Sequence, residues 1–147
     1  MKKGDYTLGQ KVNDFEKNFA KRTGAKFVIG VGNGTDALYL SLKAFNIGSG
    51  DEVITVPYTF ISTVGSIATA GAKPVFVDIK DDYNIDETQI KSAITKRTKA
   101  IMPVHWAGRP CELDKIKSIA KKYNLKIIQD ASQAIDSRFK NKQLIHF

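Results

Sequence analysis

The stretch Glu52-Val-Ile-Thr-Val-Pro-Tyr-Thr-Phe-Ile-Ser-Thr-Val-Gly-Ser-Ile-Ala-Thr-Ala-Gly-Ala-Lys-Pro-Val-Phe-Val-Asp78 decides the fold. Residues 52–56 and 73–78 are short runs rich in β-branched side chains, and such runs predict two strands. Residues 60–70, which lie between them, are mostly small or apolar and predict a helix. A strand, a helix and a second strand in this order form a crossover unit, which joins parallel strands.

The same alternation of strands and helices continues on both sides of this unit. Upstream, the apolar spacing predicts a helix over 10–21, a buried strand over 26–31 and a helix over 35–45. Downstream, it predicts a helix over 86–94 with Asp86 as its N-cap, a strand over 98–104, a helix over 112–123 and a strand over 125–130. Because no linker, repeat or low-complexity tract interrupts it, the chain is expected to be part of one α/β layered domain with a mostly parallel sheet.

Composition excludes several classes of function. The formal charge of +8 comes from 23 basic and 15 acidic residues, but the lysines are scattered among acids, which argues against a nucleic-acid-binding role. The apolar runs are short, so no membrane span is expected, and the first residues lack the apolar run of a signal peptide. The single cysteine, Cys111, cannot form an internal disulfide, which favours a cytoplasmic location.

Ligands in open parallel sheets bind beyond the carboxyl ends of the strands. The candidate site residues are therefore those that directly follow each predicted strand. They fall in residues 32–36, 57–60, 104–106 and 130–133.

The glycine-rich turn Gly32-Asn-Gly-Thr-Asp36 leads from a predicted strand directly into a helix. Small residues there let backbone amides approach a phosphate, and the Thr35 hydroxyl adds a donor. The same glycines also suit a tight turn that binds nothing, so both interpretations stay open. A dinucleotide site is disfavoured, because Thr35 replaces the third glycine of the G-x-G-x-x-G pattern and Pro57 follows the second strand where an acid is required.

Three further side chains follow the predicted strands. Asp130 ends an apolar run, so it either holds the protonated ring nitrogen of a pyridine cofactor, caps the next helix or binds a metal. No second acid or histidine lies nearby at ligand spacing, which disfavours the metal. Phe60 either stacks on an aromatic cofactor or belongs to the core, and His105 is either a base or a hydrogen-bonded structural group. Cys111 has no activating neighbour in the sequence and is expected to be inert.

Several segments, taken in order, resemble the DegT–StrS group of sugar aminotransferases, within the aspartate-aminotransferase fold type. The matching segments, which cover nearly the whole chain, are Tyr6-Thr-Leu-Gly9, Asn33-Gly-Thr-Asp-Ala-Leu38, Gly48-Ser-Gly-Asp-Glu-Val53, Thr59-Phe-Ile-Ser-Thr63, Gly71-Ala-Lys-Pro-Val-Phe-Val-Asp78, Thr98-Lys-Ala-Ile-Met-Pro-Val-His105 and Gln129-Asp-Ala-Ser-Gln133. The resemblance implies that residues 1–147 are the N-terminal part of the pyridoxal-phosphate-binding large domain. That domain is a three-layer α/β structure with a mostly parallel sheet, present here in incomplete form.

The resemblance also implies a role for individual positions. Gly34, Thr35 and Asp36 would bind the phosphate of pyridoxal 5'-phosphate. Phe60 would stack on its ring, the catalytic Asp130 would pair with the ring nitrogen, and Gln133 would lie near the phenolic oxygen. Tyr6 and Thr7 would contact the substrate. In this chemistry glutamate usually donates the amino group and a nucleotide-linked keto-sugar receives it, in a homodimer that serves polysaccharide biosynthesis.

The chain departs from the family pattern in several respects. The lysine that forms the Schiff base belongs to a later Ser-Phe-x-x-x-Lys-like segment, and the sequence ends at His146-Phe147 before it, without the C-terminal small domain. The chain as given is therefore expected to be inactive. A sugar dehydratase with histidine in place of that lysine, and a non-catalytic truncated remnant, are the alternatives. In the fold that the chain resembles, strand 26–31 pairs with the last strand of the sheet, so it is expected to lack a partner here.

Overall fold

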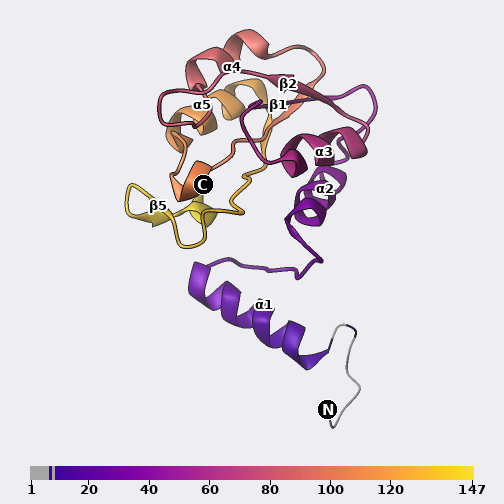
Figure 1. Ribbon diagram of the computed structural model, residues 1–147, viewed down its shortest axis with the longest axis vertical. Helices are drawn as coiled ribbons and strands as arrows, with labels where there is room; N and C mark the ends of the chain where they lie inside the picture. The colour runs from indigo at the N-terminus through magenta and orange to yellow at the C-terminus, as the bar shows by residue number, and fades with distance from the viewer. Residues whose placement is uncertain (1–6, 8) are drawn as a thin grey trace.

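A four-stranded parallel sheet lies at the centre of the computed structural model, which describes Thr7 and residues 9–147 (Figure 1). Its strands are β1 (Glu52–Thr55), β2 (Lys73–Phe76), β3 (Thr98–Ile101) and β4 (Lys126–Ile127), in the spatial order β2-β1-β3-β4. Every adjacent pair is parallel. The central strand β1 is buried along its whole length, as expected for a strand covered on both faces.

Helices cover both faces of this sheet. Helices α2 (Gly34–Ala44) and α3 (Ile61–Thr69) pack on one face, and α4 (Glu87–Ala93) and α5 (Leu113–Tyr123) pack on the other (Figure 1). Successive side chains of β1 point to opposite faces, so Val53 joins the core under α2 and α3 while Ile54 joins the core under α4 and α5. The three layers confirm the predicted fold class, and the observed elements agree with the predicted ones to within a few residues.

Two helices begin with a side-chain cap, and the cap at Asp86 was predicted from the sequence. The Asp86 carboxylate accepts a hydrogen bond from the Thr88 amide at 2.9 Å, and the Asn33 side chain accepts one from the Asp36 amide at 2.9 Å. Such caps satisfy amides that have no partner inside the helix. The Asn33 cap fixes where α2 begins and so places the glycine-rich turn at the carboxyl edge of the sheet.

The predicted buried strand over 26–31 is not formed. This segment is extended but pairs with no strand among the described residues, and Phe27 and Ile29 are 77% and 80% exposed. The apolar run predicted a strand, but a strand needs a neighbouring strand to pair with, and the described residues do not supply one. The lack of a partner agrees with the expectation drawn from the resemblance.

Helix α1 (Gln10–Thr23) is set off from the layered body in Figure 1 and is joined to it by segment 26–31. An ion pair between Arg22 and Asp136 ties the end of α1 to the C-terminal part of the chain. That part contains a hairpin of β5 (Arg138–Phe139) and β6 (Lys142–Gln143), followed by a short 3-10 helix η2 (Leu144–His146).

The turn of the β5–β6 hairpin has left-handed backbone at Lys140 (φ 48°) and Asn141 (φ 64°). Asparagine adopts this conformation more readily than most residues, so Asn141 suits this position of the turn. A second 3-10 turn, η1 (Trp106–Gly108), follows β3. No helix in the described part of the chain is long and apolar enough to cross a membrane.

Candidate functional site

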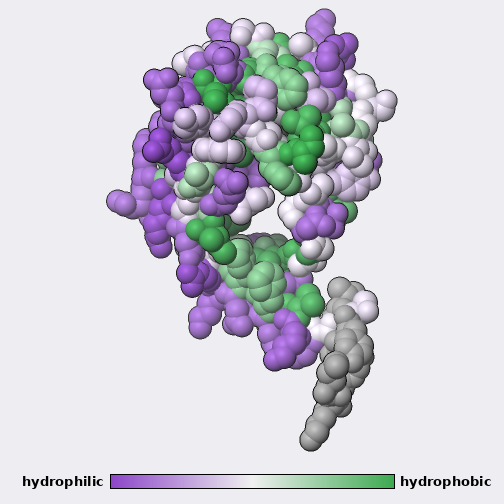
Figure 2. Space-filling view, in the orientation of Figure 1, coloured by the Kyte–Doolittle hydropathy of each residue, from purple (hydrophilic) through white to green (hydrophobic). Residues whose placement is uncertain are grey.

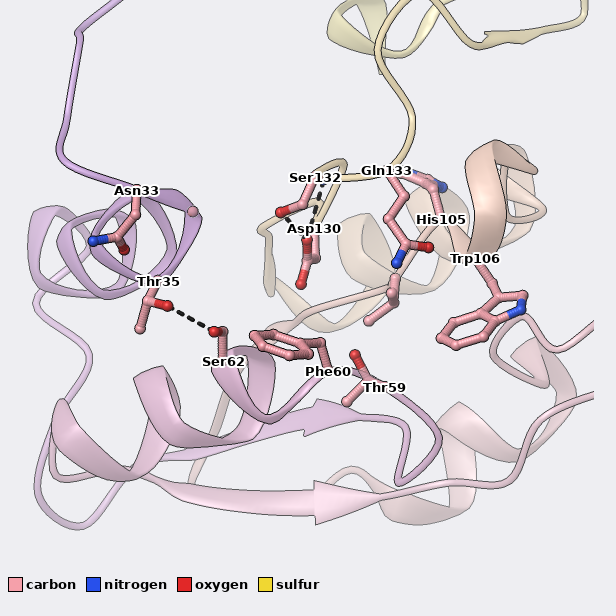
Figure 3. A pocket seen from close by; sticks show the side chains of 12 residues that line it. Asn33, Thr35, Thr59, Phe60, Ser62, His105, Trp106, Asp130, Ser132 and Gln133 are labelled. Atoms are coloured by element: carbon pink, nitrogen blue, oxygen red, sulfur yellow. Dashed lines mark hydrogen bonds between the residues drawn. The ribbon is translucent and has the colours of Figure 1, made fainter.

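A pocket of about 290 Å³ lies beyond the carboxyl ends of the strands, where parallel sheets bind their ligands (Figure 3). Its walls come from the start of α2, the start of α3, the turn after β3 and the turn after β4. The lining residues are Asn33, Gly34, Thr35, Thr59, Phe60, Ser62, Val104, His105, Trp106, Asp130, Ser132 and Gln133. Segments that are far apart in the sequence therefore meet at one site.

Asp130 is the buried acid of this pocket, with 7% of its surface exposed. A backbone bridge to Val104 continues the pairing of β3 and β4 up to Asp130 and fixes its backbone. One carboxylate oxygen accepts hydrogen bonds from the Ser132 hydroxyl (2.7 Å) and the Ser132 amide (3.2 Å), and the other accepts one from the Thr63 hydroxyl (2.7 Å). Both carboxylate oxygens therefore have hydrogen-bond partners, which hold the group in a fixed orientation.

A hydroxyl pair on α3 and its preceding loop supports this acid. The Thr63 hydroxyl, which is fully buried, lies 2.7 Å from the Thr59 hydroxyl, so Thr59 can donate to Thr63 while Thr63 donates to Asp130. Threonines four residues apart face the same side of a helix start, which is why these two meet. The chain of hydroxyls orients one carboxylate oxygen and leaves the carboxylate turned toward the pocket (Figure 3).

The N-terminus of α2 forms the opposite wall of the pocket. Within the described part of the chain, the amides of Gly34 and Thr35 donate to no protein group, whereas the Asp36 amide is satisfied by Asn33. A Cβ at Gly34 would lie 3.2 Å from the Ser132 hydroxyl, so a side chain there would crowd Ser132 at the pocket wall. The Thr35 and Ser62 hydroxyls lie 2.6 Å apart beside these amides. Amides and hydroxyls gathered at a helix N-terminus favour a phosphate over the empty-turn interpretation.

The ring of Phe60 is 69% exposed and lies at the pocket rather than in the core (Figure 3). Exposing a large aromatic ring costs free energy that burial would recover, so this position is unfavourable unless another ring covers it. Of the two interpretations of Phe60, a stacking surface therefore fits the structure and a core residue does not.

The turn after β3 is tied to Gln133. The Ala107 amide donates to the Gln133 side-chain oxygen at 2.9 Å, and Ala107 has left-handed backbone (φ 49°). This bond holds the Gln133 amide group at the pocket, and Figure 3 shows its nitrogen on the pocket side. Gln133 therefore presents a hydrogen-bond donor to a ligand.

His105 lines the same pocket but is committed to structural hydrogen bonds. Its Nδ1 accepts from the Cys111 amide at 3.1 Å, so its Nε2 donates to the Gln129 side-chain oxygen at 2.9 Å. Burial lowers the pKa of His105 below its ordinary value, which keeps the ring neutral. Burial also raises the pKa of the Cys111 thiol to about 12, in agreement with the expectation that this cysteine is inert.

The structure brings together most of the residues predicted for the site, but not all of them. Gly34, Thr35, Phe60, Asp130 and Gln133 line one pocket. Asp36 does not line it, because its carboxylate turns back and accepts a hydrogen bond from the Asn33 side chain at 3.1 Å. Thr7 lines a neighbouring groove instead, and Tyr6 lies outside the described residues.

The sequence prediction missed Ser62 and Thr63, whose hydroxyls contact Thr35 and Asp130. Asn33, Thr59 and Ser132 lay within the candidate segments, but no role was predicted for them, and the structure shows that they hold neighbouring site residues in place. A signal was available for some of them. Ser62 and Thr63 lie in the first turn of α3 and Thr59 lies in the loop just before it, which is where their side chains can reach a ligand or an acid that follows another strand.

A wide apolar groove adjoins the pocket between α1, segment 28–34 and residues 129–132. Figure 2 shows this hollow as a gap bordered by hydrophobic side chains. The groove shares Asn33, Gly34, Asp130 and Ser132 with the pocket, so the two form one continuous depression. The groove lies between segment 26–31, which pairs with no described strand, and the end of the sheet at residues 129–132.

These features together define the ligand that the pocket suits. A buried carboxylate matches a protonated ring nitrogen, an exposed phenyl ring matches a flat ring, and free amides at a helix start match a phosphate. Among the described residues no group of histidines, cysteines and acids could hold a metal ion. The donor set therefore fits a phosphorylated pyridinium cofactor.

Comparison with known proteins relates the chain to a family of aminotransferases. The family model described as the DegT/DnrJ/EryC1/StrS aminotransferase family matches residues 1–147. The chain is 48% identical over 145 residues to a dTDP-3-amino-3,6-dideoxy-alpha-D-galactopyranose transaminase of Aneurinibacillus thermoaerophilus, with 98% of this chain and 40% of the relative covered. It is 43% identical over 144 residues to a UDP-2-acetamido-2-deoxy-3-oxo-D-glucuronate aminotransferase of Pseudomonas aeruginosa, with 97% and 40% covered.

A solved structure is similar over the same region. The PLP form of a putative sugar aminotransferase of Streptococcus pneumoniae superimposes with a TM-score of 0.92 at 30% identity, covering 97% of this chain and 40% of that one. The chain spans between 36% and 40% of the length of the curated relatives that it matches first. The likeness therefore concerns the N-terminal part of these proteins.

Proposed function

We infer the function from the finding that the chain belongs to the DegT/DnrJ/EryC1/StrS aminotransferase family, whose cofactor is pyridoxal phosphate. We propose that the chain carries the cofactor site of an enzyme that transfers an amino group from glutamate to a nucleotide-linked keto-sugar. We place this enzyme in the cytoplasm, as a homodimer when complete. The names of the two relatives support the substrate class, because each acts on a sugar attached to a nucleoside diphosphate.

The observation that carries this proposal is the position of Asp130. Its carboxylate is buried, held by three donated hydrogen bonds and turned into a pocket that faces an exposed phenyl ring. A purely structural aspartate at a strand end would have no reason to point into an open cavity. In the proposed function Asp130 keeps a proton on the ring nitrogen of the cofactor.

The other pocket residues then have distinct tasks. The amides of Gly34 and Thr35, with the hydroxyls of Thr35 and Ser62, bind the phosphate, and Phe60 fixes the plane of the ring. The Gln133 amide nitrogen donates to the ring's phenolic oxygen. When bound, pyridoxal phosphate supplies an electron sink for the carbon from which a proton is removed. Ser132 and Thr63 orient the Asp130 carboxylate toward the ring nitrogen.

The direct test is an assay for amino transfer from glutamate to a nucleotide-linked keto-sugar. A polypeptide that extends residues 1–147 to the length of its relatives should form the amino-sugar and 2-oxoglutarate. Residues 1–147 alone should not, because none of the described residues that line the pocket is a lysine that could hold the cofactor covalently and move the proton. Sustained turnover by purified 1–147, or none with any nucleotide-linked keto-sugar by the extended protein, would contradict the proposal.

A further inference from the structure

Three aromatic side chains form a cluster at the carboxyl edge of the sheet, beside the cofactor pocket. Tyr58 follows β1, Tyr83 follows β2 and Trp106 follows β3. The Tyr58 ring lies 5.3 Å from the Tyr83 ring and 4.6 Å from the Trp106 ring, and the Tyr83 and Trp106 centroids are 6.4 Å apart. We call these three residues the aromatic platform. Its members come from three different loops, so the fold, not the local sequence, assembles it.

A buried asparagine holds the platform together. Asn84, which is 1% exposed, accepts a hydrogen bond from the Trp106 amide at 3.1 Å and donates to the carbonyl oxygens of Arg109 and Pro110. Asn84 thereby locks the loop that carries Tyr83 to the loop that carries Trp106. Tyr83 itself has left-handed backbone (φ 65°), a strained conformation for a bulky residue. With this backbone conformation the Tyr83 ring packs against the Tyr58 and Trp106 rings.

The platform is open to solvent and adjoins the reaction site. Tyr58 and Tyr83 are 45% and 50% exposed, although aromatic rings of this size are usually more buried. Trp106 lines the cofactor pocket, at the end opposite Thr35 in Figure 3. The platform is therefore located where a ligand that reaches out of the pocket would arrive. The cofactor's phosphate and ring are already assigned to other residues, so the aromatic platform has no role in the proposed cofactor site.

We propose that the aromatic platform binds the nucleobase of the nucleotide-linked substrate by stacking, an inference that rests on the proposed function. Each base has a flat π-face, and stacking on aromatic side chains tolerates different bases. This matches the relatives, one of which acts on a dTDP-sugar and the other on a UDP-sugar. A sugar ring can also pack against aromatic rings, but in the proposed function the keto-sugar must lie at the cofactor pocket in order to react, which leaves the base for the platform. A phosphate is better matched by cationic or amide donors than by aromatic rings.

Trp106 is the single tryptophan of residues 1–147, so in this polypeptide the tryptophan fluorescence comes from the platform, and prior saturation with pyridoxal phosphate separates the effect of the nucleotide from that of the cofactor. The protein is first saturated with pyridoxal phosphate and then titrated with UDP and, separately, with dTDP. Stacking on the platform should change the Trp106 emission, and Tyr58→Leu and Tyr83→Leu should each weaken binding of the tighter nucleotide about tenfold. Tyr83→Phe, which keeps the ring, should bind like the unmodified protein.

The matched control is Tyr123→Leu. Tyr123 ends α5 at the edge of the sheet where β4 begins, which is opposite the site, so this variant should retain full affinity. Inorganic pyrophosphate should leave the Trp106 emission unchanged, because the proposal assigns the contact to the base.

The outcomes separate this inference from the proposed function. If pyridoxal phosphate binds but neither nucleotide affects Trp106, or if both leucine variants bind normally, the platform does not hold the base while the cofactor site stands. If pyridoxal phosphate itself fails to bind, the proposed function fails first. If Tyr83→Leu changes the sedimentation of the protein instead of its nucleotide affinity, the platform is a contact between copies of the chain, and the inference is wrong.

Discussion

Replacement of Asp130 by alanine should slow amino transfer about a hundredfold in a polypeptide that extends this chain to the length of its relatives. The carboxylate is buried against Ser132 and Thr63 and faces the pocket, so its charge acts on a bound ring with little screening by water. Its loss removes the group that keeps the ring nitrogen protonated, which costs about 3 kcal/mol or more in the barrier. The measurement is the steady-state rate with saturating glutamate.

Asp114→Ala is the matched control for this change. Asp114 lies on the surface of α5, where it forms an ion pair with Lys140 and does not line the pocket, so its removal should leave the rate unchanged. Thr63→Val, which deletes one donor to the carboxylate but keeps the acid, should lower the rate less than Asp130→Ala does. A turnover of Asp130→Ala close to that of the unmodified protein would remove Asp130 from the reaction.

The second large effect concerns hydrogen exchange in residues 1–147. Amides of segment 26–31 should exchange about a thousandfold or more faster than those of Ala100 and Ile101. In that segment only the Gly30 amide has a described partner, the Glu16 carboxylate, whereas β3 pairs on both sides and Ala100 and Ile101 are fully buried. Exchange followed by mass spectrometry or NMR gives both rates in one sample.

An internal reference strengthens that comparison. Val53 and Ile54 of β1, which also pair on both sides, should be protected like β3, and Phe27 and Ile29 should exchange like an unstructured peptide. Equal strong protection of 26–31 and 98–101 would show that segment 26–31 has a pairing partner, contrary to the structure.

The sequence predicted the layers of the fold well because the signals were local. Runs of β-branched residues, helical spacing and the Asp86 cap depend only on nearby residues, and each produced the expected element. The burial of segment 26–31 was predicted wrongly for the opposite reason. Its residues have strand character, but burial requires a neighbouring strand, and the apolar pattern alone does not reveal whether that neighbour is present.

Some residues of the candidate site were also predictable from local signals, whereas others were not. Residues that follow strands were predicted as candidates, since the fold class places strand ends at one edge. The hydroxyls of Thr63 and Ser62 were not, because their importance lies in contacts with residues 67 and 27 positions away. The turn of the Asp36 carboxylate toward Asn33 and the strained Tyr83 beside Trp106 likewise depend on three-dimensional packing.

The central claim is that residues 1–147 bind pyridoxal phosphate between the start of α2 and Asp130. Titration of the isotopically labelled chain with pyridoxal phosphate, followed by amide NMR, tests it most directly. The predicted result is saturable shifts of the Gly34 and Thr35 amides that vanish in Asp130→Ala or weaken greatly, while the β5–β6 hairpin stays unchanged. Shifts that leave Gly34 and Thr35 unaffected, or that are identical with Asp130→Ala, would contradict the assignment of this pocket as the cofactor site.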